Sequence, residues 1–377
     1  MSPATGDGLR KALSKKRPAK HLGAYAAEFF TGALHLGRDP EAAQRVWDMI
    51  MSFAGYSFCK GHSCSYIQIA QHSCALRAHH PAEFMAAVLS NGGGYYQPFA
   101  YVAEAMRMGL RILPPDINAS AFRCTGKERD IRIGLQFVKG LSANAVERIL
   151  AGQPFTSIFD LRVRTGIAPG DLRLLIKVGA LDSIAQGWTR PMMLWMVDAA
   201  GQRGSADWFD DLPPAVPVLK EYSPDRRRRE EYATLGFITD AHPMQLHADR
   251  LRKYRLCRST ELHRQVGQHV LMAGMLTAAK PVSAKTDEPM EFATFDDGHG
   301  LIETVLFPDV YRKRSHVLFD QGPFIFRGKV EEEFGAVTLT ITHLDRLDRS
   351  LRPRESSPSG RQRSSIPPGQ KEPSSSR

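Results

Sequence analysis

The sequence has few cysteines and no long apolar run, and each of these features excludes a class of protein. Only five of the 377 residues are cysteine, and they are scattered along the chain. A disulfide scaffold of the secreted kind is therefore excluded, and a reducing cytoplasm is expected. No apolar run approaches the length of about eighteen residues that a membrane-spanning helix needs. The basic N-terminus also lacks the apolar stretch of a secretory signal.

Two other patterns that are absent bear on metal binding. The chain contains no Asp-Xaa-Asp sequence, and its two Asp-Asp pairs, Asp210-Asp211 and Asp296-Asp297, fall in a linker and in a predicted hairpin. It also contains no Cys-Xaa-Xaa-Cys pair, although five zinc-ligand types fall within sixteen positions. A helix over this segment would turn several of them to different faces, so a zinc-dependent regulator remains only a third hypothesis. These five residues are Cys59, His62, Cys64, His72 and Cys74.

The net charge of +10 is concentrated at the two ends of the chain. Residues 1–20 and residues 349–377 each carry a net charge of +5, which leaves the body between them close to neutral. Basic tails attract any polyanion without much specificity. The overall charge is therefore a weak argument for DNA binding, and the motifs of the body must carry that argument.

The first third of the chain has helical periodicity. We expect helices over 41–53 and 63–79, another that begins at Pro81 and ends at the glycines 92–94, and one over 96–108. After Pro114-Pro115, the segments 122–125 and 131–133 form a small predicted hairpin, and the pattern is helical again to residue 184.

A repeat within this second helical part predicts tandem helix-hairpin-helix motifs. The segment 134–142 precedes a helix over 143–150, and 174–182 echoes it forty positions later. Glycine lets the backbone approach a phosphate, and the N–H groups of the next helix start bind it without reading the base sequence. The first copy offers Lys139, Gly140, Leu141 and Ser142 for DNA. The second offers Gly179, but Ala180 replaces the hairpin glycine, so that copy has either a DNA-binding or a structural role.

The last third changes to the period of β-strands. Residues 199–225 read as a linker, and Arg226 to Arg229 open a helix whose arginines face either solvent or phosphate. Five strands are expected, with one helix over 308–318 between the third and the fourth, which is the OB-fold arrangement. Arg327 and Lys329, with nearby aromatics, are candidates to bind single-stranded DNA, although alternation sends some of the aromatics into the core. The expected strands are 270–276, 291–295, 301–307, 324–330 and 337–342, and the aromatics are Phe292, Phe295, Phe307, Phe324 and Phe326.

One stretch, residues 53–66, combines aromatics, small residues and phosphate-binding groups. Lys60 offers a point charge, and His62 and Ser63 offer hydrogen-bond donors. We expect Ser63 to cap the following helix, whose free N–H groups and dipole also favour an anion. The physical interpretation is a polyphosphate site at the start of a helix.

The same stretch resembles, nearly residue for residue, the fingers of bacterial DNA polymerase III alpha subunits, most closely their error-prone branch. The resemblance continues through 79–96 and 107–118, and returns at 232–237 and 241–244. It implies that Lys60, His62, Ser63 and Tyr66 line the triphosphate of the incoming nucleotide. It also implies that Lys15 and Lys16, in a basic stretch with Lys11 and Arg17, contact template or primer phosphates, or else belong to a disordered leader.

The resemblance also assigns a role to the linker. Ser205, Ala206, Asp207, Trp208 and Phe209 match the position of the family's internal peptide for binding the sliding clamp. That peptide normally begins with glutamine, and Ser205 stands in its place, so we expect weakened docking. The alternative is that Trp208 and Phe209 pack on neighbouring helices.

The predicted architecture is a multidomain α+β chain, and the predicted parts follow the family in order. They are a basic leader (1–20), the C-terminal part of the polymerase fingers (21–118), a tandem helix-hairpin-helix DNA-binding domain (119–198), a linker with a degenerate clamp-binding peptide (199–225), a helical connector (226–265), a five-stranded OB-fold β-barrel (266–347) and a disordered basic tail (348–377).

The resemblance implies a function in error-prone, translesion-type DNA synthesis. Family palms hold two metal ions with an Asp-Xaa-Asp pair and a further Asp, and this chain has no such pair, so we expect it to be inactive alone, with no catalytic residue and no metal of its own. It would bind primer-template and single-stranded DNA and deoxynucleoside triphosphate, while the parent polymerase uses Mg²⁺. The expected partners are a sliding clamp and a separately encoded palm, and the expected location is the bacterial cytoplasm at the nucleoid. The alternative is a stand-alone, non-enzymatic DNA-binding module.

Overall fold

The computed structural model describes residues 2–13, 22–52, 60–92, 94–202, 216–284, 286–319 and 322–347. The chain divides into two compact units, residues 1–80 and residues 81–377. The first unit ends within the predicted fingers part, and the predicted boundary at 118/119 stays a prediction. No helix in the described ranges is both long and apolar enough to cross a membrane.

The first unit is helical. Three of its helices enclose a small core, in which Leu9, Leu13 and Trp47 are buried and the rings of Phe29 and Trp47 lie 5.4 Å apart. The fourth helix has no buried side chain among those described. The helices are α1 (Pro3–Leu13), α2 (Leu22–His35), α3 (Pro40–Ser52) and α4 (Lys60–His79).

The second unit begins with two helices and a small sheet. Helices α5 (Pro81–Asn91) and α6 (Pro98–Arg107) both start with proline, whose fixed φ suits the first helical turn. A hairpin is present here, but its first strand lies two to three residues later than predicted. It consists of β2 (Thr125–Lys127) and β3 (Asp130–Arg132), and a third strand, β1 (Arg111–Leu113), is parallel to β3. A Cβ at Gly126 would overlap the backbone of Ala82, so this close approach of sheet and helix requires glycine.

The helix-hairpin-helix region follows the small sheet. The motif's first segment is only a 3-10 turn, η1 (Leu135–Phe137), before α7, while the second copy is α9 followed by a 3-10 turn, η2 (Asp182–Ile184). These segments share one core with α5, α6 and the sheet, which is why the compact unit starts at residue 81. The remaining helices here are α7 (Ala143–Gly152), α8 (Ile158–Thr165), α9 (Pro169–Lys177) and α10 (Arg190–Gln202).

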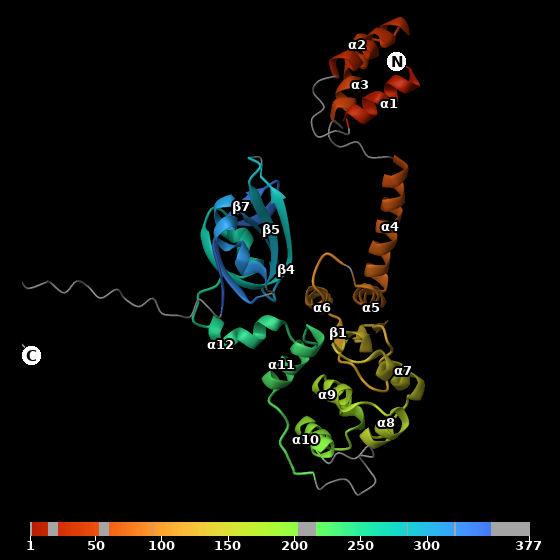
Figure 1. The fold of residues 1–377 in the computed structure, drawn as a ribbon. Helices are drawn as coiled ribbons and strands as arrows, with labels where there is room; N and C mark the ends of the chain where they lie inside the picture. Colours follow the sequence, from red (N-terminus) through yellow and green to blue (C-terminus); the bar gives the residue numbers. More distant parts are fainter. Residues whose placement is uncertain are drawn as a thin grey trace, which may run out of the picture. The chain divides into compact units, whose positions relative to one another are not determined.

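A helical connector leads from this region to the barrel (Figure 1). Helix α11 starts after the Ser223 cap, whose side chain accepts from Arg226 N, and ends at Gly236 in the left-handed conformation. The connector consists of α11 (Pro224–Leu235), η3 (Pro243–His247), α12 (Ala248–Leu251) and η4 (Ser259–Gln265).

The last part is a closed five-stranded barrel with strand order β4-β5-β6-β8-β7, as predicted for an OB-type barrel. The predicted helix between the third and fourth strands is α13 (Pro308–Arg314), continued by the 3-10 turn η5 (Ser315–Phe319). All five predicted strands are present, and most are longer than predicted. They are β4 (His269–Ser283), β5 (Pro289–Asp296), β6 (Leu301–Leu306), β7 (Phe324–Glu333) and β8 (Ala336–Arg346).

Candidate nucleic-acid interface

The predicted nucleotide-binding residues all lie in the first two turns of α4. The helix begins at Lys60, three residues earlier than predicted, so the expectation that Ser63 caps it is wrong. Helical periodicity places positions 62, 63 and 66 on one side of the helix, whereas position 60 lies about 160° around the axis from position 62. His62 and Tyr66 are exposed, with their rings 4.6 Å apart. The phosphate-binding role of Lys60, His62, Ser63 and Tyr66 stays a prediction.

The zinc-ligand types lie along the same helix rather than around a centre. Cys64 and Cys74 are exposed free thiols, and Cys59 lies outside the described residues. Nowhere in the described part of the chain do three or more His, Cys, Asp or Glu side chains come close enough to hold a metal ion.

Two sets of predicted site residues lie outside the described ranges. The first is the basic pair Lys15 and Lys16, and the second is the clamp-binding peptide, Ser205 to Phe209. Both stay predictions from the sequence.

The first hairpin has the backbone form that phosphate binding requires, but a carboxylate already accepts from two of its donors. Gly140 has φ +84°, a left-handed conformation that favours glycine. Ser142 caps α7, since its Oγ accepts from Ala145 N, and its own N–H and Oγ donate to the buried Asp171 at 3.1 and 2.7 Å. The predicted phosphate contact is thereby limited to Gly140 and the first N–H groups of α7, which a helix start leaves unpaired, and it stays a prediction.

Lys139 anchors this hairpin to the end of α11. Its backbone N–H donates to Thr234 O at 3.1 Å, and its Nζ would lie 2.9 Å from a Cβ at Gly236, the residue that ends the helix. The negative end of a helix dipole favours a cation at this position. Lys139 is exposed, so its charge is also accessible to a phosphate.

The second hairpin has an internal cation where a phosphate would approach. Gly179 also has a positive φ, +76°, but it is buried, and a Cβ there would overlap the Arg190 guanidinium. Arg190 donates to both carboxylate oxygens of Asp182, at 2.7 and 3.2 Å. Of the two roles that the sequence leaves open, this geometry favours the structural one.

The barrel aromatics divide into buried and exposed sets. Phe295, Phe324 and Phe326 are fully buried, and the Phe295 ring contacts the other two, whereas Phe292 and Phe307 are 45% and 47% exposed. Three of the five aromatics therefore belong to the core. The exposed pair lies on β5 and directly after β6, the second and third strands, which are the strands that OB-folds use for oligonucleotides.

The predicted cations lie elsewhere on the barrel. Arg327 and Lys329 are both exposed on β7, which pairs with β4 and β8 but not with β5 or β6. Lys329 also forms an ion pair with Glu331 at 3.5 Å. The cation that does lie beside an exposed aromatic is Lys280, opposite Phe292 in the β4–β5 register. The sequence reasoning missed Lys280 because the predicted first strand ended at Leu276.

A buried polar junction joins the barrel to the helices. Asp296 on β5 is fully buried, and Arg107 of α6 donates to it at 3.1 Å. His242 Nε2 lies 3.5 Å from the same carboxylate and makes no hydrogen bond within the described residues, while its Nδ1 accepts from Met244 N. Burial lowers the pKa of His242, an effect that outweighs the nearby Asp296, which favours protonation. The imidazole is therefore neutral in the folded chain at neutral pH.

We expect this histidine to make folding sensitive to acid. In the unfolded chain His242 becomes protonated near pH 6.5. In the folded chain the lowered pKa means that protonation requires a lower pH. The free energy of unfolding should therefore fall as the pH falls from about 7.5 through about 6.5 and below. Urea unfolding of the wild type and His242→Gln across this range measures the effect. If the variant keeps the whole pH slope, the assignment to His242 is wrong.

Comparison with known proteins gives consistent matches. A helix-hairpin-helix motif family matches residues 109–190. An error-prone DNA polymerase from Rhodopirellula baltica is 30% identical over 364 residues, covering 92% of this chain and 31% of that protein. The DNA polymerase III subunit alpha of Vibrio cholerae is 32% identical over 351 residues, covering 86% and 30%. This chain thus spans about a third of the length of the curated relatives it matches.

Solved structures add little. The asparaginyl-tRNA synthetase of Pyrococcus horikoshii matches 24% of this chain at 16% identity with a TM-score of 0.21, a likeness too small to carry an argument. The sequence relatives confirm the expected resemblance to bacterial error-prone polymerases and alpha subunits.

Proposed function

We propose that this chain, a relative of bacterial error-prone DNA polymerases over nine tenths of its length, supplies DNA binding to a translesion-type polymerase. The observation that carries the proposal is the combination of a glycine hairpin at a helix start with an OB-type barrel in one compact unit. The hairpin would bind the backbone of primer-template DNA without reading its sequence, and the β5–β6 face would bind single strands.

The nucleotide-binding part of the proposal rests on α4. Lys60, His62, Ser63 and Tyr66 would bind the triphosphate of an incoming deoxynucleotide at the start of this helix. Phosphoryl transfer needs carboxylates that hold metal ions. The described residues offer no such group, and the sequence contains no Asp-Xaa-Asp. We therefore assign no step of the reaction to this chain, and expect purified protein to give no primer extension with Mg²⁺ and all four deoxynucleotides.

One observation supports the hypothesis that a separate chain supplies the catalytic palm. Tyr66, Ile67 and Ile69 on α4 are each at least 60% exposed, which is unusual for large side chains of a helix without a partner. The competing candidate, a non-enzymatic DNA-binding module, needs no such partner. Mixing this chain with a palm fragment of an error-prone relative separates the two: restored primer extension favours the polymerase part, and unchanged inactivity favours the module.

Lys139 gives a direct test of phosphate binding at the first hairpin. We expect Lys139→Gln to weaken binding to all DNA sequences alike and to reduce the salt slope of log K by about one, because the variant neutralises one phosphate fewer. Anisotropy titrations between low and moderate salt measure both quantities. Lys220→Gln, which removes an exposed lysine before α11, is the control and should change neither. Identical behaviour of the two variants would contradict the role of the hairpin.

A further inference from the structure

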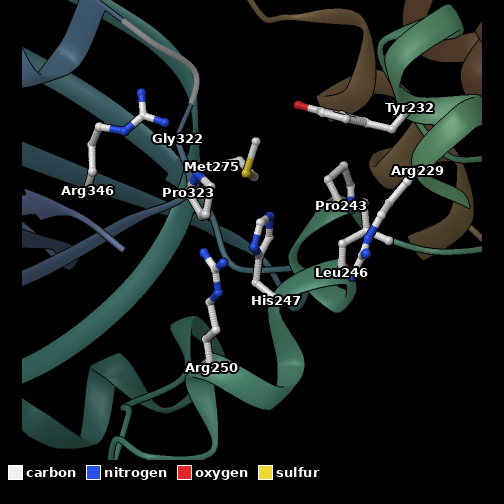
Figure 2. Close-up of a pocket in the computed structure, with 10 residues that line it drawn as sticks. All are labelled: Arg229, Tyr232, Pro243, Leu246, His247, Arg250, Met275, Gly322, Pro323 and Arg346. Atoms are coloured by element: carbon white, nitrogen blue, oxygen red, sulfur yellow. The ribbon is translucent and has the colours of Figure 1, made fainter. Parts of the chain in front are cut away.

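A cationic cavity lies where the connector meets the barrel (Figure 2). Its volume is about 440 Å³, within the range of pockets that hold small ligands. It is formed by α11, η3 and α12 on one side, and on the other by the middle of β4, the two residues before β7 and the end of β8. The residues that line it are Arg229, Tyr232, Pro243, Leu246, His247, Arg250, Met275, Gly322, Pro323 and Arg346.

The charge of this cavity is of one sign. Its lining includes three arginines and a histidine but no carboxylate. Figure 2 shows Arg250 and His247 rising from the connector, and Arg346 on the barrel side of the cavity. Arginine presents planar, bidentate donors that match phosphate oxygens. An anion would therefore meet cations from both sides of the cavity.

Several neighbouring arginines of the connector have partners within the chain. Arg228 pairs with Asp240 at 2.9 Å, Arg226 stacks on the Tyr222 ring, and Arg252 pairs with Asp249 at 3.2 Å. Arg229 and Arg250, by contrast, form no ion pair with any residue in the described ranges. Both line the cavity with their charge unneutralised.

The other walls of the cavity are apolar and aromatic. Met275 is buried beneath it, and Pro243, Leu246 and Pro323 contribute further apolar surface. Tyr232 extends from α11 across the opening in Figure 2. Burial raises the pKa of Tyr232, so its hydroxyl remains a neutral donor at physiological pH. Cations beside an aromatic wall are the combination by which proteins hold single strands, with phosphates on the basic groups and a base against the ring.

We propose that this cavity binds one nucleotide of single-stranded DNA, with Arg229, Arg250 and Arg346 on its flanking phosphates and the base against Tyr232. The proposal rests on the proposed DNA-binding function and names a site for the unpaired strand that neither the hairpin nor the β5–β6 face provides. A duplex keeps its bases stacked inside, so it cannot place one against Tyr232. The preferred ligand is therefore single-stranded.

The test compares two double variants of the full chain that remove equal charge. The double variant Arg229→Gln/Arg250→Gln removes the two cations of the cavity that form no ion pair. Arg252→Gln/Arg255→Gln removes two exposed arginines from the same connector, outside the cavity. Each protein is titrated into labelled oligo(dT) across a salt series, and thermal unfolding checks that both are folded.

We expect the cavity variant to bind oligo(dT) at least tenfold more weakly, with a salt slope reduced by about 0.7 for each phosphate that it no longer neutralises. The control variant should stay within about twofold of the wild type. Tyr232→Leu should weaken oligo(dT) binding several-fold and leave the salt slope unchanged. Equal losses in the two double variants would overturn the proposal, because they would show a diffuse charge effect.

Competition distinguishes a strand from a free anion. Pyrophosphate, dTTP and unlabelled oligo(dT) are each used to displace labelled oligo(dT) from the wild type, at equal concentrations of phosphate. If pyrophosphate or dTTP competes as well as unlabelled oligo(dT), the proposal is overturned in favour of a small-anion site. A wild type that binds no DNA overturns the proposed function and this site together. A wild type that binds DNA no more tightly than the cavity variant overturns this site alone.

Discussion

Replacement of Asp296 by alanine should lower the free energy of unfolding by about 3 kcal/mol. Removing one partner of a buried ion pair leaves the other charge uncompensated, at a cost of about 3–5 kcal/mol. We expect the lower end because the Arg107 side chain is a quarter exposed and keeps its pair with Glu104 at 3.1 Å. The variant also leaves Gly298 N–H without its acceptor. Urea unfolding at neutral pH measures the change.

The control for this prediction is Asp249→Ala. Asp249 forms an ion pair of similar length with Arg252, but both side chains are about four fifths exposed or more. Exposed pairs contribute about 0–1 kcal/mol, so this variant should unfold nearly as the wild type does. Similar stabilities for Asp296→Ala and Asp249→Ala would contradict the role assigned to the buried junction.

Phe326→Ala should also destabilise the chain strongly, by about 3–5 kcal/mol. Phe326 is fully buried in the barrel, and its ring lies 4.5 Å from that of Phe295, which also contacts Phe324. Truncation removes apolar packing on several sides and leaves a cavity that neighbouring strands cannot close. Denaturant unfolding monitored by circular dichroism measures the loss.

Phe292→Ala is the matched variant on the barrel surface. Phe292 is 45% exposed, so its truncation should change the free energy of unfolding by no more than about 1 kcal/mol. If bases stack on the β5–β6 face, however, oligo(dT) affinity should fall by about 1–3 kcal/mol. Strong destabilisation by Phe292→Ala, or none by Phe326→Ala, would contradict the division between core and surface aromatics.

The barrel was predictable from the sequence because its signals are local. Alternating apolar residues mark each strand, and the glycines at 298 and 300 mark the turn that makes β5 and β6 a hairpin. Strand length was less predictable: β4 continues from Leu276 to Ser283 through residues without clear alternation, held by its register with β5. That continuation places Lys280 beside Phe292.

The contacts that organise the second unit were not predictable in the same way. Strand β1 has only three residues and depends on parallel pairing with β3, and the Arg107–Asp296 contact joins residues 189 positions apart. The hydrogen bond from Ser142 to Asp171, and the position of the Arg190 guanidinium beside Gly179, likewise depend on tertiary packing. Periodicity therefore located the two hairpins but could not show which of them stays accessible to DNA.

The structure shows what two of the segments that resemble the polymerase family contact. Ala241 to Met244 contributes His242 to the buried junction and Pro243 to the cationic cavity. The arginine run that opens α11 divides among an ion pair, a stacking contact and the cavity, so neither a solvated face nor a phosphate site describes all of it.

The most direct test of DNA binding by the body of this chain is an anisotropy titration of the full chain and of residues 21–347 across a salt series. Primer-template, single-stranded and duplex DNA serve as ligands. We predict that the trimmed chain, without most of the +10 charge carried by the two ends, still binds, and that it prefers primer-template or single strands to duplex. Loss of all binding on trimming would contradict the account, because it would show that only the basic ends hold DNA.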